Sequence, residues 1–166
     1  RIVFQDYNSN PLSINIKLIK VDNNSGYEIN FKAHDLNFKD IMTNKTFYIQ
    51  NSNKFILLDF WGTWCKPCLD LLPNLKSIFK RYGGDKFNIY GIAHDDELSI
   101  VKNHLKSKNV VWPNVFDNRN SAELVNLYKV QSFPTFILID PNGKIIYRGI
   151  GKSSLNHIDK ILSKLY

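Results

Sequence analysis

The sequence predicts an α/β sandwich, in which a central mixed β-sheet is flanked by helices. Short apolar runs, typical of strands covered on both faces, alternate with segments whose apolar residues recur at helical spacing. The expected order is strand, helix, strand, helices, hairpin and helix, which gives the sheet both parallel and antiparallel strands. With 166 residues, 43% of them hydrophobic, the chain can bury the core of one domain.

The first 37 residues predict an N-terminal β-hairpin extension, or the tail of an upstream domain. Residues 13–21 and 27–33 each alternate apolar and polar side chains, as half-buried strands do. Residues 22–26 between them are rich in the residue types that form turns. We therefore expect residues 1–37 to stand apart from the main domain.

The main domain is expected to cover residues 38–166. Its elements should be, in chain order, a small hairpin over 38–49, a strand over 55–61, a helix ending at Gly83, a strand over 87–93, a helix over 97–108, a short helix capped by Ser121, strands over 135–139 and 144–147, and a last helix capped by Ser153 or Ser154. Pro73 lies inside the first helix, where a proline predicts a kink.

The two cysteines of the chain, Cys65 and Cys68, predict chemistry rather than structural cross-linking. A bridge between them closes a very short loop and so removes little chain entropy. They fall where the helix should begin, and unpaired N–H groups there favour a thiolate. Pro67 suits the first turn of a helix, and Lys66 adds a positive charge. Cys65 should attack, and a more buried Cys68 should resolve the mixed disulfide.

Two other interpretations of the pair remain open at this point: inert core cysteines, or half of a zinc site. Zinc would require two further ligands. The four histidines, His34, His94, His104 and His157, show no paired spacing. We therefore expect no metal, and the helix-start context favours redox chemistry.

The chain resembles the thioredoxin superfamily. Residues 57–68, Leu-Leu-Asp-Phe-Trp-Gly-Thr-Trp-Cys-Lys-Pro-Cys, are similar to its active-site strand and turn, and residues 133–140 are similar to its cis-proline strand. Residues 94–118 resemble the insertion of extracytoplasmic thioredoxin-like proteins of the cytochrome c maturation type. The resemblance extends to domains of the alkyl hydroperoxide reductase and thiol-specific antioxidant type. The resemblance covers residues 38–166 and implies a thioredoxin-like sandwich.

The resemblance assigns roles to several residues. Asp59 would be a buried acid behind the cysteines that exchanges protons with Cys68; alternatively, it is a structural acid at a strand end. Thioredoxins also place a lysine near this acid, and residues 88–93 contain none. Pro134 would be cis and would lie against Cys65.

The remaining site residues would contact the substrate. Phe133 would offer backbone groups to a substrate peptide, and its bulk would narrow the groove; alternatively, it is a core aromatic. Trp64, Lys66 and Pro67 would complete the substrate-binding surface. His94 follows a parallel strand, so it would lie near the cysteines or else be a solvated loop histidine.

The function implied by the resemblance is a thiol–disulfide oxidoreductase that reduces disulfides in exported proteins. The expected partners are a disulfide-bearing protein substrate and a redox donor protein, and no cofactor is expected. The alternatives are a disulfide oxidant or isomerase, a thiol peroxidase, and a partner-binding module with a weakly active thioredoxin fold. The peroxidase motif has a threonine three residues before its cysteine, where this chain has Gly62.

Charge and chain ends add further expectations. The net charge is +7, but the basic residues are scattered, which argues against a nucleic-acid partner. Because the chain starts at Arg1 rather than Met, we expect that a segment preceded it, such as a membrane anchor. We expect a monomer located outside the cytoplasm, either in the periplasm or anchored to the membrane and facing it.

Overall fold

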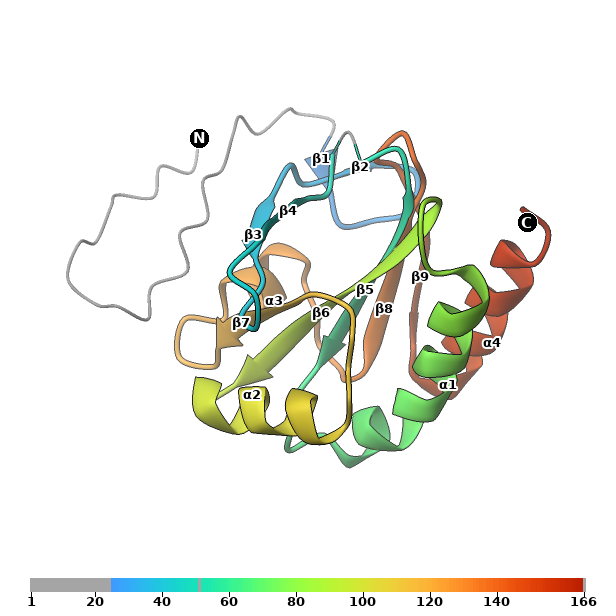
Figure 1. Cartoon of the computed structure of the whole chain (residues 1–166). Helices are drawn as coiled ribbons and strands as arrows, with labels where there is room; N and C mark the ends of the chain where they lie inside the picture. The colour runs from blue at the N-terminus through green and yellow to red at the C-terminus, as the bar shows by residue number, and fades with distance from the viewer. Residues whose placement is uncertain (1–24, 51, 166) are drawn as a thin grey trace.

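A five-stranded mixed sheet forms the centre of the protein (Figure 1). The computed structural model describes residues 25–50 and 52–165. The sheet order is β7-β6-β5-β8-β9. Strands β5, β6 and β7 run parallel to one another, and β8 pairs antiparallel with both of its neighbours, β5 and β9. The elements are β5 (Phe55–Trp61), α1 (Lys66–Tyr82), β6 (Phe87–Asp95), α2 (Leu98–Ser107), β7 (Asn114–Asn118), α3 (Glu123–Leu127), β8 (Thr135–Ile139), β9 (Ile145–Ile150) and α4 (Gly151–Leu162). The predicted fold class is confirmed.

Strand β5 lies in the middle of the sheet, where its apolar run is covered on both faces. All of its residues except the first, Phe55, are buried. The strand pairs with β6 on one side and with β8 on the other, which places Asp59 opposite Gly91 and Phe136. At the carboxyl end of the central strand β5, the chain turns directly into α1. The residues between them therefore lie at the middle of the sheet, level with the carboxyl ends of its parallel strands.

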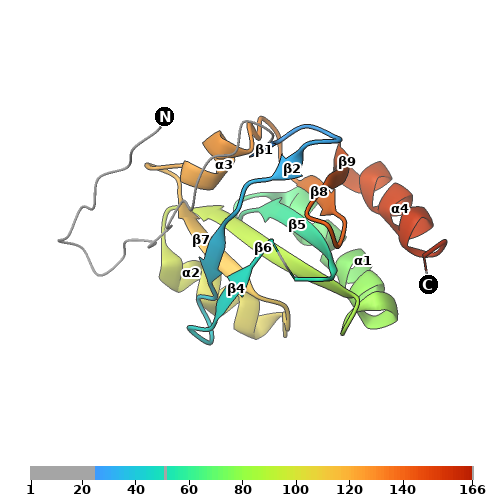
Figure 2. The same cartoon turned by 90° about the horizontal axis from the view of Figure 1, so that it is seen from above.

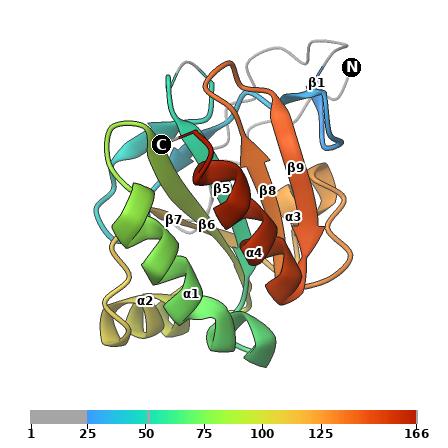
Figure 3. The same cartoon turned by 90° about the vertical axis from the view of Figure 1, so that its right-hand side faces the viewer.

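Helices α1 and α4 cover one face of the sheet, and α2 lies beside α1 (Figure 3). The apolar side chains packed on this face include Leu57, Leu71, Leu75, Ile78, Ile89, Leu138, Leu155, Ile158 and Leu162. They come from α1, α4 and alternate positions of the strands, as the period of two in a strand requires. Among the described residues, no helix combines the length and the apolar character needed to cross a membrane.

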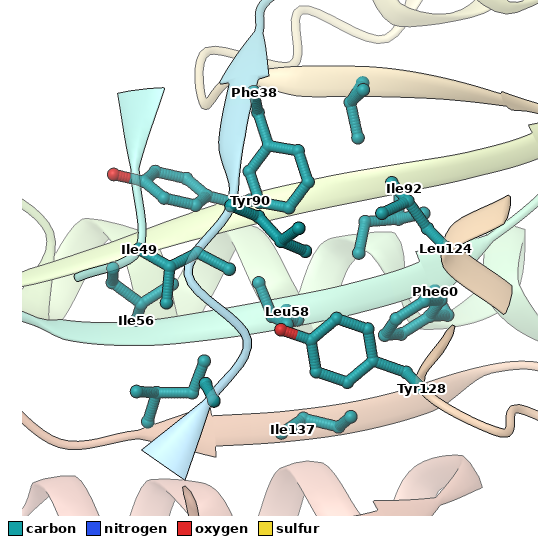
Figure 4. Close-up of a cluster of buried hydrophobic side chains, with 14 of the residues drawn as sticks. Phe38, Ile49, Ile56, Leu58, Phe60, Tyr90, Ile92, Leu124, Tyr128 and Ile137 are labelled. Carbon is teal, nitrogen blue, oxygen red and sulfur yellow. The ribbon is translucent and has the colours of Figure 1, made fainter. Parts of the chain in front are cut away.

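Helix α3 and a small hairpin cover the opposite face (Figure 1). The hairpin consists of β3 (Asn37–Lys39) and β4 (Thr46–Tyr48), paired antiparallel as predicted. Figure 4 shows the core on this face, where Phe38 from the hairpin and Tyr128, which follows α3, pack onto strand residues such as Leu58. The hairpin and α3 thus together form the layer that covers this second face of the sheet.

The predicted N-terminal hairpin is wrong in its second strand. Residues 27–31 form a turn, and only the short strands β1 (Ser25–Gly26) and β2 (Lys32–Ala33) pair, in parallel. This segment runs beside the turn between β8 and β9 (Figure 2), where Ala33 N donates to Gly143 O at 2.8 Å. Local alternation was overridden by this contact with a distant turn. The first predicted strand, residues 13–21, lies outside the described residues, and the domain boundary at residue 37 stays a prediction.

Both predicted serine caps are also wrong. Helix α3 follows Ala122, which has φ 47°, and the carboxylate of Asp117 accepts the N–H groups of Leu124 and Val125. Helix α4 begins at Gly151, ahead of the predicted serines, and Ser154 Oγ donates to Ile150 O instead of capping. At the start of α3, the buried Asp117 of β7 thus satisfies the N–H donors that Ser121 was expected to satisfy.

Candidate active site

Cys65 and Cys68 are joined by a disulfide at the start of α1, with their Cα atoms 5.3 Å apart. Cys65 is the N-cap residue, and its Sγ accepts the backbone N–H of Cys68 at 3.3 Å. Pro67 lies in the first turn, where a proline leaves no donor unsatisfied. In the reduced protein, the same N–H group and the helix dipole would stabilise a thiolate at Cys65.

The expected difference in burial between the two cysteines is not observed. Cys65 is 4% exposed and Cys68 is 6% exposed. Both belong to a cluster with Trp61, and Phe133 packs against that cluster. The two cysteines are therefore buried to nearly the same extent, whereas Cys68 was expected from the sequence to be the more buried one.

Asp59 is the buried acid that the sequence predicts behind the cysteines. It is 5% exposed, and burial raises its pKa from 3.8 to about 7. Asp59 and Cys68 line one small cavity between β5, α1 and α2. The cavity offers about 20 Å³ to the centre of a water molecule, which is enough for one water. A carboxyl group that titrates near neutral pH can exchange protons there.

The raised pKa of Asp59 makes the folded protein less stable as the pH rises. The carboxyl ionises near 3.8 in the unfolded chain and near 7 in the folded one, so stability falls between these values and levels off above them. Asp59→Asn removes this cost. In urea unfolding of the disulfide form, the free energy of unfolding of the variant should exceed that of the parent by up to about 4 kcal/mol at pH 8, and by much less at pH 4. An equal difference at both pH values would contradict the raised pKa.

The turn between β5 and α1 is held by the end of β6. Both the backbone N–H and the hydroxyl of Thr63 donate to Asp95 Oδ2, at 2.7 and 2.6 Å. A Cβ at Gly62 would lie 2.5 Å from Trp64 Nε1 and 2.7 Å from His94 O, so the turn requires glycine there. Asp95 is 4% exposed, and no role in the site was predicted for it from the sequence.

Trp64, Phe133 and His94 form an aromatic surface beside the turn that carries the cysteines. Trp64 is 47% exposed, and its Nε1 donates to His94 O at 2.8 Å. Its ring contacts Phe133 edge-on, and the Arg119 guanidinium lies 5.2 Å over it. The His94 ring stacks on Phe133, while its Nδ1 lies 3.2 Å from the carboxylate of Asp117. His94 is therefore part of this surface and not a solvated loop residue.

The remaining predicted site residues lie at the borders of this surface. The peptide bond between Phe133 and Pro134 is cis, as expected, and Gly151 N donates to Pro134 O at 3.0 Å. Lys66 is exposed and pairs with Asp70 at 2.9 Å. Its charge is therefore largely balanced and hydrated, which weakens the effect on the thiolate that the sequence suggested.

The sequence profile of the thioredoxin-like family matches residues 53–145, more than half of the chain. The chain belongs to the thioredoxin-like family. It is 32% identical over 136 residues to thiol-disulfide oxidoreductase ResA of Bacillus thuringiensis subsp. konkukian (strain 97-27), covering 82% of this chain and 75% of that protein. It is 31% identical over 117 residues to ResA of Bacillus subtilis (strain 168), covering 70% of this chain and 62% of that protein.

A solved structure gives the same picture for this thioredoxin-like protein. The thiol-disulfide oxidoreductase from Bacteroides fragilis NCTC 9343 superposes with a TM-score of 0.68 at 27% identity, over 79% of this chain and 98% of that one. These relatives confirm the predicted family, the fold and thiol–disulfide exchange as the class of reaction.

Three residues of the site were not singled out by sequence reasoning. Asp95 and Arg119 hold the active-site turn and Trp64, and His104 lines the cavity of Asp59. The last two come from residues 96–122, far along the chain from the cysteines. The only available signal was that the segment after β6 begins at the same sheet edge as the cysteines. Within the part of the chain that the structure describes, no three potential metal ligands gather into a site.

Proposed function

We propose that this thioredoxin-like protein reduces disulfides in exported proteins. The proposal depends above all on one arrangement: a cysteine pair at a helix start, with a buried carboxyl that shares a cavity with Cys68. The helix start supports a nucleophilic thiolate at Cys65. Asp59, with a pKa raised by burial to about 7, supports proton transfer at physiological pH.

The reaction proceeds in two exchanges. The Cys65 thiolate attacks one sulfur of the substrate disulfide, which forms a mixed disulfide and releases the other substrate sulfur as a thiolate. Asp59 then takes the proton of the Cys68 thiol, and the Cys68 thiolate attacks Cys65 Sγ. The second substrate sulfur leaves as a thiolate. The substrate gains two electrons, and the protein is left with the disulfide between Cys65 and Cys68.

The substrate binds along the aromatic surface outside the disulfide. Trp64 offers an exposed ring, while Phe133 and the cis Pro134 come just before β8, and Phe133 packs against the cluster that contains both cysteines. Lys66 and Pro67 are exposed at the start of α1 and complete the surface. Because Cys65 is only 4% exposed, an incoming disulfide must displace some of the side chains around it, and Phe133 is one of those that pack against its cluster.

Reduction is favoured over oxidation because little extra charge stabilises the thiolate. An oxidant has a strongly stabilised thiolate, and here Lys66 is occupied by Asp70 and exposed to water. Equilibration with glutathione buffers should give a reduction potential in the range of reducing thioredoxins, below about −200 mV. A value near that of strong oxidants, about −120 mV, would contradict reduction as the direction.

Peroxide reduction is not favoured. The hydroxyl of Thr63 donates to Asp95, so it is committed to holding the turn.

The proposal includes a disulfide-bearing protein substrate, a redox donor protein and a location outside the cytoplasm, which rest on the resemblance of residues 94–118. Location can be tested with a membrane-impermeant maleimide on intact cells, which should label reduced Cys65. Labelling only after lysis would contradict it.

A further inference from the structure

His104 places an unpartnered nitrogen inside the molecule. It lies on α2, where its ring packs against Trp61 with centroids 5.5 Å apart. Its Nε2 is buried and has no hydrogen-bond partner among the described residues. A buried polar atom without a partner is costly, so it calls for a ligand or a water.

The cavity that contains Asp59 and Cys68 is also lined by His104. Its other walls are mostly apolar, such as Leu72 of α1 and Leu105 of α2, and the amide of Asn114 is already hydrogen-bonded to Trp61 Nε1 and Trp112 O. Polar side chains of β5, α1 and α2, together with Asn114 of β7, therefore line a space that can hold one water. A water in such a place requires polar partners, and the unpartnered imidazole nitrogen supplies one.

The imidazole is suited to hold a water without adding charge. Burial, reinforced by the charge of Lys108, lowers the pKa of His104, whereas Asp95 acts in the opposite direction. The ring is therefore neutral at pH 7, with one nitrogen as a donor and the other as an acceptor. It can orient a water without competing with Asp59 for the proton.

We propose that His104 is a positioning residue, which holds a cavity water that carries the proton from Cys68 to Asp59. The inference rests on the proposed function, because the proton moves only in the resolving step. The thiol of Cys68 gives its proton to the water, and the water gives another to the carboxylate of Asp59. The water is regenerated, Asp59 becomes neutral, and the thiolate of Cys68 attacks Cys65 Sγ.

The test uses the reduced protein and an aromatic disulfide, dithiobis(nitrobenzoate). Attack by Cys65 releases a first thionitrobenzoate, and attack by Cys68 releases a second. The rate of the second release is measured from pH 5 to 9 in the parent, His104→Phe and His104→Gln. The ¹³C-carboxyl titration of Asp59 is recorded in each protein. His157→Gln is the matched control, since His157 is exposed and stacks on Tyr147.

In His104→Phe, the second release should slow about tenfold at pH 7, because the phenyl ring excludes the water, and the pKa of Asp59 should rise. His104→Gln should stay within about twofold of the parent, since an amide also donates and accepts. A parental rate and titration in His104→Phe would overturn the inference, as would an equal loss in His104→Gln. If the parent itself releases no second thionitrobenzoate, the proposed function fails instead.

Discussion

Cys65→Ser should abolish disulfide reduction, with a loss of at least about 10³-fold in the rate of insulin reduction by dithiothreitol. A hydroxyl at this position does not ionise at neutral pH, so the N-cap position and the N–H of Cys68 have no thiolate to stabilise. Cys68 is the only other cysteine in the chain, and it does not hold the N-cap position that favours a thiolate. The loss should therefore not recover at high pH.

Cys68→Ser is the matched control for this variant. The two cysteines are buried to nearly the same extent, 4% and 6% exposed, so either serine should perturb the fold similarly. Cys68→Ser should also lose catalytic turnover, but it should retain the first exchange with an aromatic disulfide. If Cys65→Ser retained that exchange, the assignment of Cys65 as nucleophile would be wrong.

Asp59→Asn should slow the resolving step about tenfold near pH 7.5, because an amide cannot accept the proton of Cys68. In the parent, the rate should rise with pH through an inflection near 7, as burial places the pKa of Asp59 there. In the variant, the inflection should move up to the ionisation of the Cys68 thiol itself, about 8.5 or higher. The two proteins should therefore converge as the pH approaches 9 to 10.

The control for Asp59→Asn is Asp159→Asn, which removes a carboxylate that pairs with Arg81 on the surface formed by α1 and α4. Its pH profile should match the parent. An Asp59→Asn variant with the parental inflection would show that another group accepts the proton. That result would leave the cysteine chemistry intact and remove Asp59 from it.

Much of the fold could be predicted because its signals are local. The apolar run of β5 and the helical spacing of α1 are complete within their own segments, and Pro67 and the cysteines mark the junction between them. Strand β7 was not predicted, because its residues include Asn114 and Asp117, whose burial depends on partners elsewhere. Asn114 Oδ1 accepts from Trp61 Nε1, and Asp117 accepts from the start of α3.

The candidate site divides in the same way. Cys65, Cys68 and Asp59 could be found from one continuous motif, and Pro134 from a second. Asp95, Arg119 and His104 could not, because each contacts the motif across at least 32 residues of chain and has no distinguishing neighbours in sequence. The relative burial of the two cysteines was also mispredicted, since Cys65 lies in the same buried cluster as Cys68, against which the distant Phe133 packs.

Peptide mapping of trapped mixed disulfides tests the assignment of Cys65 and Cys68 most directly. Each single serine variant is incubated with a disulfide-bearing unfolded protein, quenched with acid, digested and analysed by mass spectrometry. We predict a substrate adduct on Cys65 in Cys68→Ser and none above background on Cys68 in Cys65→Ser. Equal adducts in the two variants, or an adduct only on Cys68, would contradict the account of an attacking Cys65 and a resolving Cys68.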